Sequence, residues 1–257
     1  MRLAVFKVGG SVITVKSRNF TVNRRNMDRV ARELAGLYKD GWRLVVVHGG
    51  GSFGHPVAAA YGLSEGGLEG RKLVGFAETR YWMSVLNLRF TRRLLEAGLP
   101  ASPLQTSAVA VNRDGGLCGL DSRMVRDYVE RGVVPVLYGD AVIDSVRGAS
   151  ILSGDDLAAR LAVDLGAEAL VFVMGAGGIY DKPPGVPGAR LLAEVGPDTE
   201  VVFGEARGVD VTEGVRRKLA AALAAARRGV RVAVGGVSLI SDMVEGRGGG
   251  YTRVRWR

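Results

Sequence analysis

Two glycine-rich stretches of the chain carry the residue types that could do chemistry. In one of them, an apolar β-branched run at residues 45–47 leads into His48 and then into Gly49–Gly51. His55 stands four residues after the third glycine, and the chain contains no histidine besides these two. Glycine accepts positive φ and lets backbone N–H groups crowd an anion, so a strand that ends in such a loop predicts a phosphate site. His55 could donate a charge-assisted hydrogen bond there, although a glycine-rich turn with an incidental histidine remains an equal alternative.

The other stretch opens the chain. An apolar run at residues 3–6 leads to Lys7, the triplet Gly9–Ser11 follows, and Lys16 stands five residues further on. This spacing is neither that of a Walker P-loop nor that of a dinucleotide-binding fingerprint. Taken alone, this pattern does not identify a phosphate site. Together the two loops suggest two phosphates that face each other across one edge of a sheet.

These motifs resemble those of the amino acid kinase superfamily. Within it, a histidine at the position of His55 is typical of the isopentenyl phosphate kinases. Fosfomycin kinase is similar there, whereas the acetylglutamate, carbamate and uridylate kinases lack that residue. The resemblance covers essentially the whole chain, because it continues through residues 75–80, 138–140, 152–156 and 210–218.

The resemblance implies an α/β fold with an open, mostly parallel sheet sandwiched by helices, in which two lobes share one sheet. One amino acid kinase-like domain would span residues 1–257, with an acceptor-phosphate lobe at about 1–165 and a nucleotide lobe at about 166–257. The implied reaction is phosphorylation of isopentenyl phosphate to isopentenyl diphosphate, in isoprenoid biosynthesis by the alternative mevalonate route. ATP would be the donor, Mg²⁺ would arrive with it, and the chain would form a homodimer.

The resemblance also assigns roles to single residues. The catalytic residues would be His55, Lys16, Lys7 and Asp155. ATP would be bound by Lys7, Gly9, Gly10, Ser11, Gly51, Thr212, Gly214 and Lys218, and the acceptor by Gly50, His55, Gly139 and Gly154. Lys16 would contact the transferring phosphoryl group, and Asp155 would hold the lysines. This set suits phosphoryl transfer, which needs positioning and charge neutralisation rather than covalent chemistry. No metal-binding motif is evident.

Apolar periodicity and turn residues predict the elements that must position these groups. They are a helix at 26–39, a strand at 44–47, a long helix at 70–97, a strand at 133–137, a hairpin of 141–143 with 149–152, a helix after Ser153, a strand at 169–174, a helix at 215–228 capped by Thr212, and a strand at 230–234 that closes the sheet. Of the two acids after Ser153, one suffices for capping, which leaves the other free.

The long helix at 70–97 is apolar on more than one face, so it must cover the sheet and also meet something else. A core helix is the simplest interpretation. The resemblance adds a homodimer contact and a wall for the isoprenoid tail, which we expect in the region of Phe76, Ala77 and Trp82.

One stretch departs from the family. Related kinases usually carry Thr-Asp-x-Asp-Gly-Val-Tyr where this chain has residues 174–180, without the hydroxyl and both carboxylates. Asp181 compensates only in part, so we expect loose discrimination between nucleobases.

Composition limits the other function classes. With 47% hydrophobic and 24% charged residues the chain is ordinary for a globular protein. The single Cys118 excludes an intrachain disulfide and, with no signal peptide pattern, favours the cytoplasm. No apolar run is long enough for membrane insertion. The net charge of +9 comes from scattered arginines without a nucleic-acid-binding motif, so we expect no nucleic acid partner. A kinase for another small phosphate or phosphonate, such as fosfomycin, and a non-catalytic nucleotide-binding regulatory module remain as alternatives.

Overall fold

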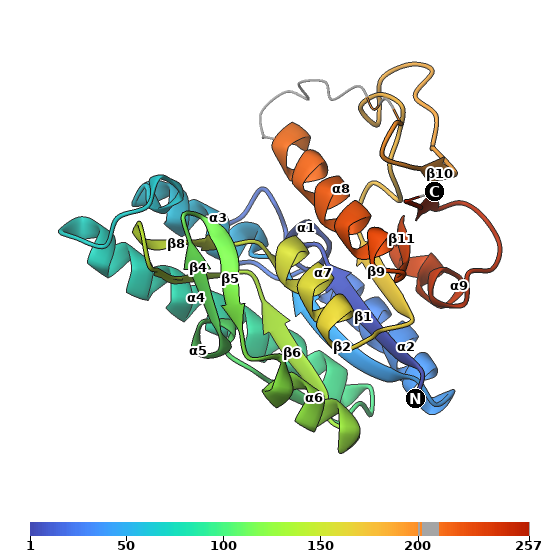
Figure 1. Cartoon of the computed structure of the whole chain (residues 1–257), viewed down its shortest axis with the longest axis horizontal. Coiled ribbons are helices and arrows are strands. Elements are labelled where there is room, and N and C mark those ends of the chain that lie inside the picture. Colours follow the sequence, from blue (N-terminus) through green and yellow to red (C-terminus); the bar gives the residue numbers. More distant parts are fainter. Residues whose placement is uncertain (200, 202–210, 257) are drawn as a thin grey trace.

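A large sheet of eight strands runs through the centre of the computed structural model, which describes residues 1–199, 201 and 211–256 (Figure 1). Its strands follow the most apolar stretches of the chain, as parallel strands covered on both faces require. The order is β10-β12-β11-β9-β1-β2-β6-β3, and every neighbouring pair is parallel except β11 with β12. The strands are β1 Leu3–Val8, β2 Arg43–His48, β3 Ala101–Pro103, β6 Val134–Tyr138, β9 Ala169–Val173, β10 Glu194–Val195, β11 Arg231–Gly235 and β12 Thr252–Val254.

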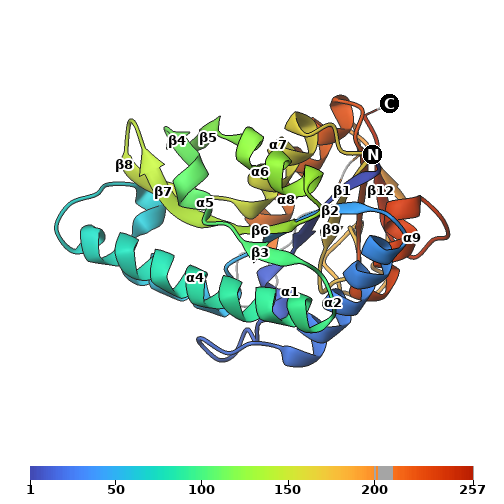
Figure 2. The ribbon, with the colours of Figure 1, turned by 90° about the horizontal axis from the view of Figure 1, so that it is seen from below.

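Helices cover both faces of this sheet, because alternate strand residues point to opposite sides. In β1, Phe6 and Val8 belong to one core and Leu3 and Val5 to the other. One core packs under α1 Gly10–Ile13, α2 Arg24–Lys39, α3 Gly51–Ala60, α4 Arg71–Glu96 and α9 Ile240–Glu245. The other packs under α6 Ser122–Glu130, α7 Gly154–Asp164 and α8 Val211–Arg227. Figure 2 shows the two layers, with α2 and α4 on one side of the sheet and α6 and α7 on the other.

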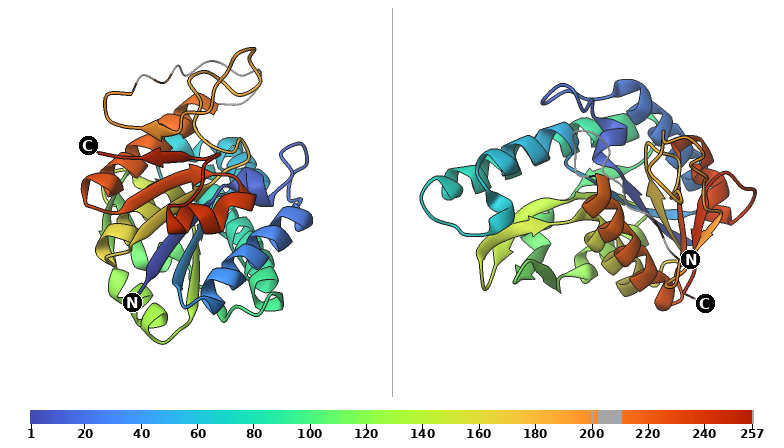
Figure 3. Two further views of the ribbon diagram at one scale, coloured as in Figure 1. Left: turned by 90° about the vertical axis from the view of Figure 1, so that its right-hand side faces the viewer. Right: turned by 90° about the horizontal axis from the view of Figure 1, so that it is seen from above.

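A smaller sheet is built from two hairpins and lies at the end of the molecule opposite the C-terminal strands, as the right view of Figure 3 shows. Its strands are β4 Ala110–Arg113, β5 Gly116–Leu120, β7 Asp140–Asp144 and β8 Gly148–Leu152, in the order β5-β4-β7-β8. The buried carboxylate of Asp144 ties both turns together at 2.8–3.0 Å: it accepts hydrogen bonds from the N–H groups of Asp114, Gly115, Val146 and Arg147 and from the hydroxyl of Ser150.

The predicted fold class is confirmed, and most predicted elements lie within two residues of their predicted bounds. The long helix predicted at 70–97 is α4, preceded by Gly70 as N-cap. Two predictions are wrong. The helix predicted at 215–228 begins four residues earlier, so the predicted N-cap position of Thr212 falls within α8 and not before it. The strand predicted at 230–234 does not close the sheet, since β12 and β10 lie beyond β11.

Candidate active site

The two glycine loops lie side by side because they follow neighbouring parallel strands. Val8, at the end of β1, pairs with His48, at the end of β2. The loops approach each other so closely that a side chain on Gly10 would collide with the backbone N of Gly51. Gly51 also has φ of 50°, a conformation that favours glycine. The sequence therefore needs glycine at both positions for the loops to meet at one edge of the sheet.

Three charged side chains meet beside these loops. The ammonium groups of Lys7 and Lys218 each lie 2.8 Å from Oδ1 of Asp155. Lys7 comes from β1, Lys218 from α8 and Asp155 from the first turn of α7, and all three are at least nine-tenths buried. Ser153 caps α7 by accepting the N–H of Asp155 at 3.1 Å, which leaves the carboxylate free for the lysines. Residues from opposite ends of the chain thus converge on one carboxylate.

The charges in this cluster shift each other's pKa. Burial alone would raise the pKa of Asp155, but the ammonium groups of Lys7 and Lys218 lower it to about 2. Burial and the charge of Lys7 lower the pKa of Lys218 to about 8, although Asp155 opposes this shift. Two cations therefore share one anion, and the cluster carries a net positive charge at neutral pH. A phosphate is the kind of ligand that this excess charge suits.

His55 lies in α3, just beyond the second glycine loop. Its ring packs against Gly50, where a side chain would come within 3.0 Å of Cδ2 of His55. Partial desolvation of the ring and the charges of Lys7 and Lys16 lower the pKa of His55 below 6.5. These causes favour the neutral form of the imidazole when no ligand is bound. The charge-assisted hydrogen bond expected from the sequence would need the negative charge of an acceptor to restore the proton.

The other residues assigned to the site are placed as follows. Gly139 and Gly154 lie at the same edge of the sheet: a side chain on Gly139 would come within 2.8 Å of the N of Gly154. Gly9 donates its N–H to Val173 at 2.8 Å and so joins the first loop to β9. Three residues are exposed and do not belong to the cluster of Lys7, Lys218 and Asp155: Ser11, Lys16 and Gly214. The side chain of Thr212 lies outside the described residues.

The other histidine has a buried environment that sequence reasoning did not identify. His48 is fully buried, with Nδ1 at 3.1 Å from the carbonyl of Gly49 and Nε2 at 3.2 Å from the amide nitrogen of Asn87. Its ring stacks on Tyr138 with centroids 5.4 Å apart. Burial is the main cause that lowers its pKa to about 4, so this ring is neutral. The sequence signal that could have indicated this burial is the position of His48 at the end of an apolar, buried strand.

The long helix presents the three predicted tail-wall residues in different directions. Ala77 is exposed. Trp82 stacks on Phe20, with ring centroids 3.9 Å apart, and so packs against the loop that follows α1. Phe76 is half-buried under the guanidinium of Arg80, which lies 5.3 Å from the ring centroid. Of the three residues, Phe76 and Trp82 are therefore partly buried and Ala77 is not.

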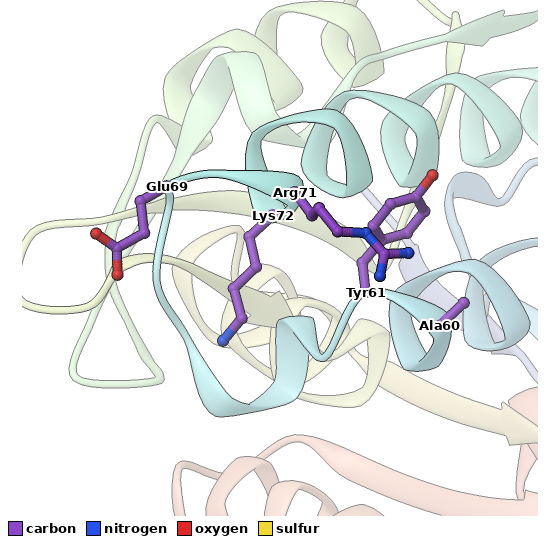
Figure 4. A pocket seen from close by; sticks show the side chains of 5 residues that line it. All are labelled: Ala60, Tyr61, Glu69, Arg71 and Lys72. Atoms are coloured by element: carbon purple, nitrogen blue, oxygen red, sulfur yellow. The ribbon is translucent and has the colours of Figure 1, made fainter.

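A surface hollow of about 300 Å³ lies near the turn between α3 and α4 (Figure 4). It is lined by Ala60, Tyr61, Glu69, Arg71 and Lys72. The guanidinium of Arg71 lies over the ring of Tyr61, 5.7 Å from its centroid. None of the residues assigned to the reaction lines this hollow, so it is separate from the glycine loops.

Comparison with known proteins identifies the family. The sequence pattern of the Amino acid kinase family matches residues 2–236. The chain belongs to the amino acid kinase family. This kinase is 37% identical over 239 residues to the isopentenyl phosphate kinase of Methanothermobacter thermautotrophicus, covering 89% of this chain and 88% of that protein. It is 34% identical over 217 residues to the isopentenyl phosphate kinase of Thermoplasma acidophilum, covering 84% of each.

Solved structures agree with this result. An X-ray structure of isopentenyl phosphate kinase superposes with a TM-score of 0.84 at 31% identity, covering 98% of this kinase and all of that chain. The resemblance inferred from the two glycine loops is therefore confirmed, and the chain is an enzyme of the phosphotransferase class. Within the described residues of this kinase, the helices are too short or too polar for a membrane span.

Proposed function

We propose that this kinase transfers the γ-phosphoryl group of ATP to isopentenyl phosphate, giving isopentenyl diphosphate. The observation that carries the proposal is the position of His55 beside Gly50. Gly50 lies on the second glycine loop, residues 49–52, here called the acceptor loop, next to the cluster of two lysines and one aspartate. The phosphate of an acceptor can bind at this position, so the acceptor does not need the charged head group of an amino acid. The curated relatives at 37% and 34% identity bear the same name, isopentenyl phosphate kinase.

The proposed roles follow from charge and position. An ammonium group has three N–H donors, and Asp155 engages one donor of each lysine, so Lys7 and Lys218 retain donors for the phosphates of ATP. Gly50 and Gly51 lie at the start of α3, where backbone N–H groups lack helical partners and attract anions. We assign Lys16 to the transferring phosphoryl group. These cations offset the repulsion between the two phosphates as one is moved onto the other.

The remaining nucleotide and acceptor contacts are proposed with them. Gly9, Gly10, Ser11, Gly51, Thr212 and Gly214 would surround ATP, and Gly139 and Gly154 would adjoin the acceptor. We also propose an acceptor-phosphate lobe at about 1–165, whose glycine loops would reach the nucleotide phosphates, and a nucleotide lobe at about 166–257. We propose that Mg²⁺ arrives with ATP, since Asp155 already pairs with two lysines and Asp156 with Arg217 at 2.6 Å. The exposed thiol of Cys118 supports a reducing compartment, the cytoplasm.

We also propose a homodimer that forms through α4. Four large apolar residues on this helix, spaced seven apart, are more than half exposed: Val74, Tyr81, Leu88 and Leu95. A spacing of seven places them on one side of the helix, as at a contact between two helices. Sedimentation analysis of the chain and of a Tyr81→Glu, Leu88→Glu double variant tests this. A wild-type chain that sediments as a monomer would end the proposal.

A coupled ADP-release assay separates the candidate functions. It compares isopentenyl phosphate, dimethylallyl phosphate, fosfomycin and glutamate as acceptors, each with ATP and Mg²⁺. We expect the highest kcat/KM for isopentenyl phosphate. A higher kcat/KM for fosfomycin would make fosfomycin the proposed substrate. ATP binding without ADP formation in the presence of any of the four acceptors would favour a regulatory module.

A further inference from the structure

The loop at residues 15–21, here called the lysine loop, joins α1 to α2 and carries Lys16. Its base is closed by a hydrogen bond of 2.9 Å from the N–H of Val15 to the carbonyl of Thr21. Residues 16–19 between these points are exposed. Lys16 forms no ion pair within the part of the chain that the structure describes, so no acidic side chain holds its ammonium group, and the backbone of the loop sets the region that this group can reach. The charge of Lys16 is felt at His55, whose pKa it helps to lower.

Phe20, at the C-terminal end of the lysine loop next to Thr21, anchors the loop. This residue has φ of 54°, a left-handed conformation that is unusual for a bulky side chain. Its ring stacks on Trp82 of α4, with centroids 3.9 Å apart and ring planes 21° apart. The ring also meets Phe53 of α3 edge-on at 5.9 Å. Figure 2 shows the dark-blue loop after α1 beside α4.

Two hydrogen bonds hold the backbone of Phe20 as well. Its N–H donates to the carbonyl of Ser52 at 3.0 Å, which ties the lysine loop to the acceptor loop. Its carbonyl accepts a hydrogen bond from Nη1 of Arg89 at 3.4 Å. An unfavourable backbone conformation persists only where the surroundings impose it. Here the aromatic stack and these contacts impose it, and they fix the loop to α3 and α4 at once.

We propose that Phe20 and Trp82 are positioning residues for phosphoryl transfer, which hold the lysine loop so that Lys16 reaches the transferring group. The inference rests on the role proposed above for Lys16. Neither ring needs to touch a substrate. Because residues 16–19 are exposed, loss of the stack would leave the loop attached through Val15 and Thr21 but would let the residues between them, Lys16 included, move. A displacement of about 1 Å in a reacting group can lower the rate about 10²-fold.

Kinetic comparison of matched variants tests this. Phe20→Ala and Trp82→Ala should each lower kcat by about 10- to 100-fold, while KM for ATP changes by less than about threefold. Phe20→Tyr and Trp82→Phe keep an aromatic ring at each position and should restore most of kcat. Trp42→Phe is the control, because Trp42 is a fully buried aromatic residue that contacts Arg2 and Glu245 rather than the loop. It should leave kcat unchanged.

A double-mutant cycle separates positioning from general destabilisation. If Trp82 acts through Lys16, then Trp82→Ala should cause no further loss of kcat in a Lys16→Ala background, whereas independent effects would multiply. Full multiplication, or an unchanged kcat in Phe20→Ala, would overturn the proposal.

Trypsin gives a readout that needs no activity, since the loop contains Lys16 and Arg18 in exposed positions. We expect Phe20→Ala and Trp82→Ala to be cut faster after these residues than the wild type and Trp42→Phe. Equal cleavage rates would overturn the proposed anchoring even if the wild type proved inactive on isopentenyl phosphate. Faster cleavage with such an inactive wild type would instead overturn only the proposed function.

Discussion

The hydroxyl of Thr14 accepts a hydrogen bond of 3.1 Å from the backbone N–H of Ser52, and so links the two glycine loops. The same hydroxyl donates to the carbonyl of Gly10 at 2.8 Å. Thr14 is buried, so both bonds form away from solvent. One buried side chain thus links the loop assigned to the nucleotide to the loop assigned to the acceptor.

Thr14→Val should destabilise the fold by about 1–3 kcal/mol, because it leaves the buried N–H of Ser52 without a partner. Thr14→Ser keeps the hydroxyl and should lose less. Urea unfolding of the three proteins measures the difference. Equal free energies of unfolding for the valine and serine variants would show that the hydroxyl does not link the loops.

His55→Ala should lower kcat/KM for isopentenyl phosphate by about 10²–10³-fold, since one donor to the transition state is lost. ATP affinity should be almost unchanged, because His55 lies on the acceptor side. Steady-state kinetics and calorimetry with ATP measure the two effects. A variant with normal kcat/KM for the acceptor would remove His55 from the mechanism.

Lys218 should give the reaction an alkaline limb near pH 8. Burial, then the charge of Lys7, lower the pKa of Lys218 to about 8, so above this pH the free enzyme loses a cation assigned to ATP. We expect kcat/KM for ATP to fall about tenfold per pH unit there. Bound phosphates favour the charged ammonium, so the limb in kcat should lie at higher pH.

Profiles recorded from about pH 6 to about pH 10 test this, with Lys218→Arg as the control, since its guanidinium stays charged throughout. A wild-type profile of kcat/KM that stays flat over this range would contradict the assignment.

Asp144→Asn should destabilise the small sheet by about 1–3 kcal/mol at pH 7, because at least one N–H donor then faces an amide nitrogen instead of an oxygen. Although burial opposes the shift, hydrogen bonds led by the N–H of Arg147 lower the pKa of Asp144 well below its usual range. A carboxyl with a depressed pKa stabilises the fold above the pKa of the unfolded chain, about 4, and this contribution is lost as pH falls further.

The difference between wild type and Asp144→Asn should therefore shrink below about pH 4. Asp114→Asn is the matched control: it lies in the neighbouring turn, and its side chain is 70% exposed. It should cost less than about 1 kcal/mol. Unfolding curves at several pH values measure all three proteins, and a pH-independent difference would argue against the charge of Asp144.

Nucleobase discrimination should be loose. The loop at residues 174–180 carries little polar side-chain chemistry, and the carboxylate of Asp181 already accepts the N–H of Arg190 at 2.8 Å. GTP, CTP and UTP should therefore support kcat/KM within about 10²-fold of ATP. Measurement of the four nucleotides at saturating acceptor decides this. A preference for ATP above about 10⁴-fold would mean that backbone groups read the base.

The elements that could be predicted from sequence are those with strong local signals. Continuous apolar runs gave β1, β2 and β9, and helical periodicity gave α4. The strand β12 could not be found in this way, because Thr252–Val254 is short, includes an arginine and follows a glycine run. Its place in the sheet depends on antiparallel pairing with β11, a long-range contact.

The candidate site shows the same division. The glycine loops were indicated by local sequence and the lysines by their resemblance to those of the amino acid kinases, whereas the difference between the two histidines was not predicted. His48 is neutral because its surroundings bury it. The pKa of His55 is lowered first by desolvation of its ring and then by the charges of Lys7 and Lys16, and these effects exist only in the folded chain. The stack of Phe20 on Trp82 joins residues far apart in the chain, so no local pattern indicates it.

The position of β1 has a consequence for the order of folding during synthesis. One edge of β1 pairs with β2, which is translated soon after it, whereas the other edge pairs with β9, Ala169–Val173. More than a hundred further residues must leave the ribosome after β2 before that edge is covered. An apolar strand with an unpaired edge is a template for aggregation. The emerging chain therefore carries its greatest risk of misassociation while its N-terminal half is complete and its sheet is not.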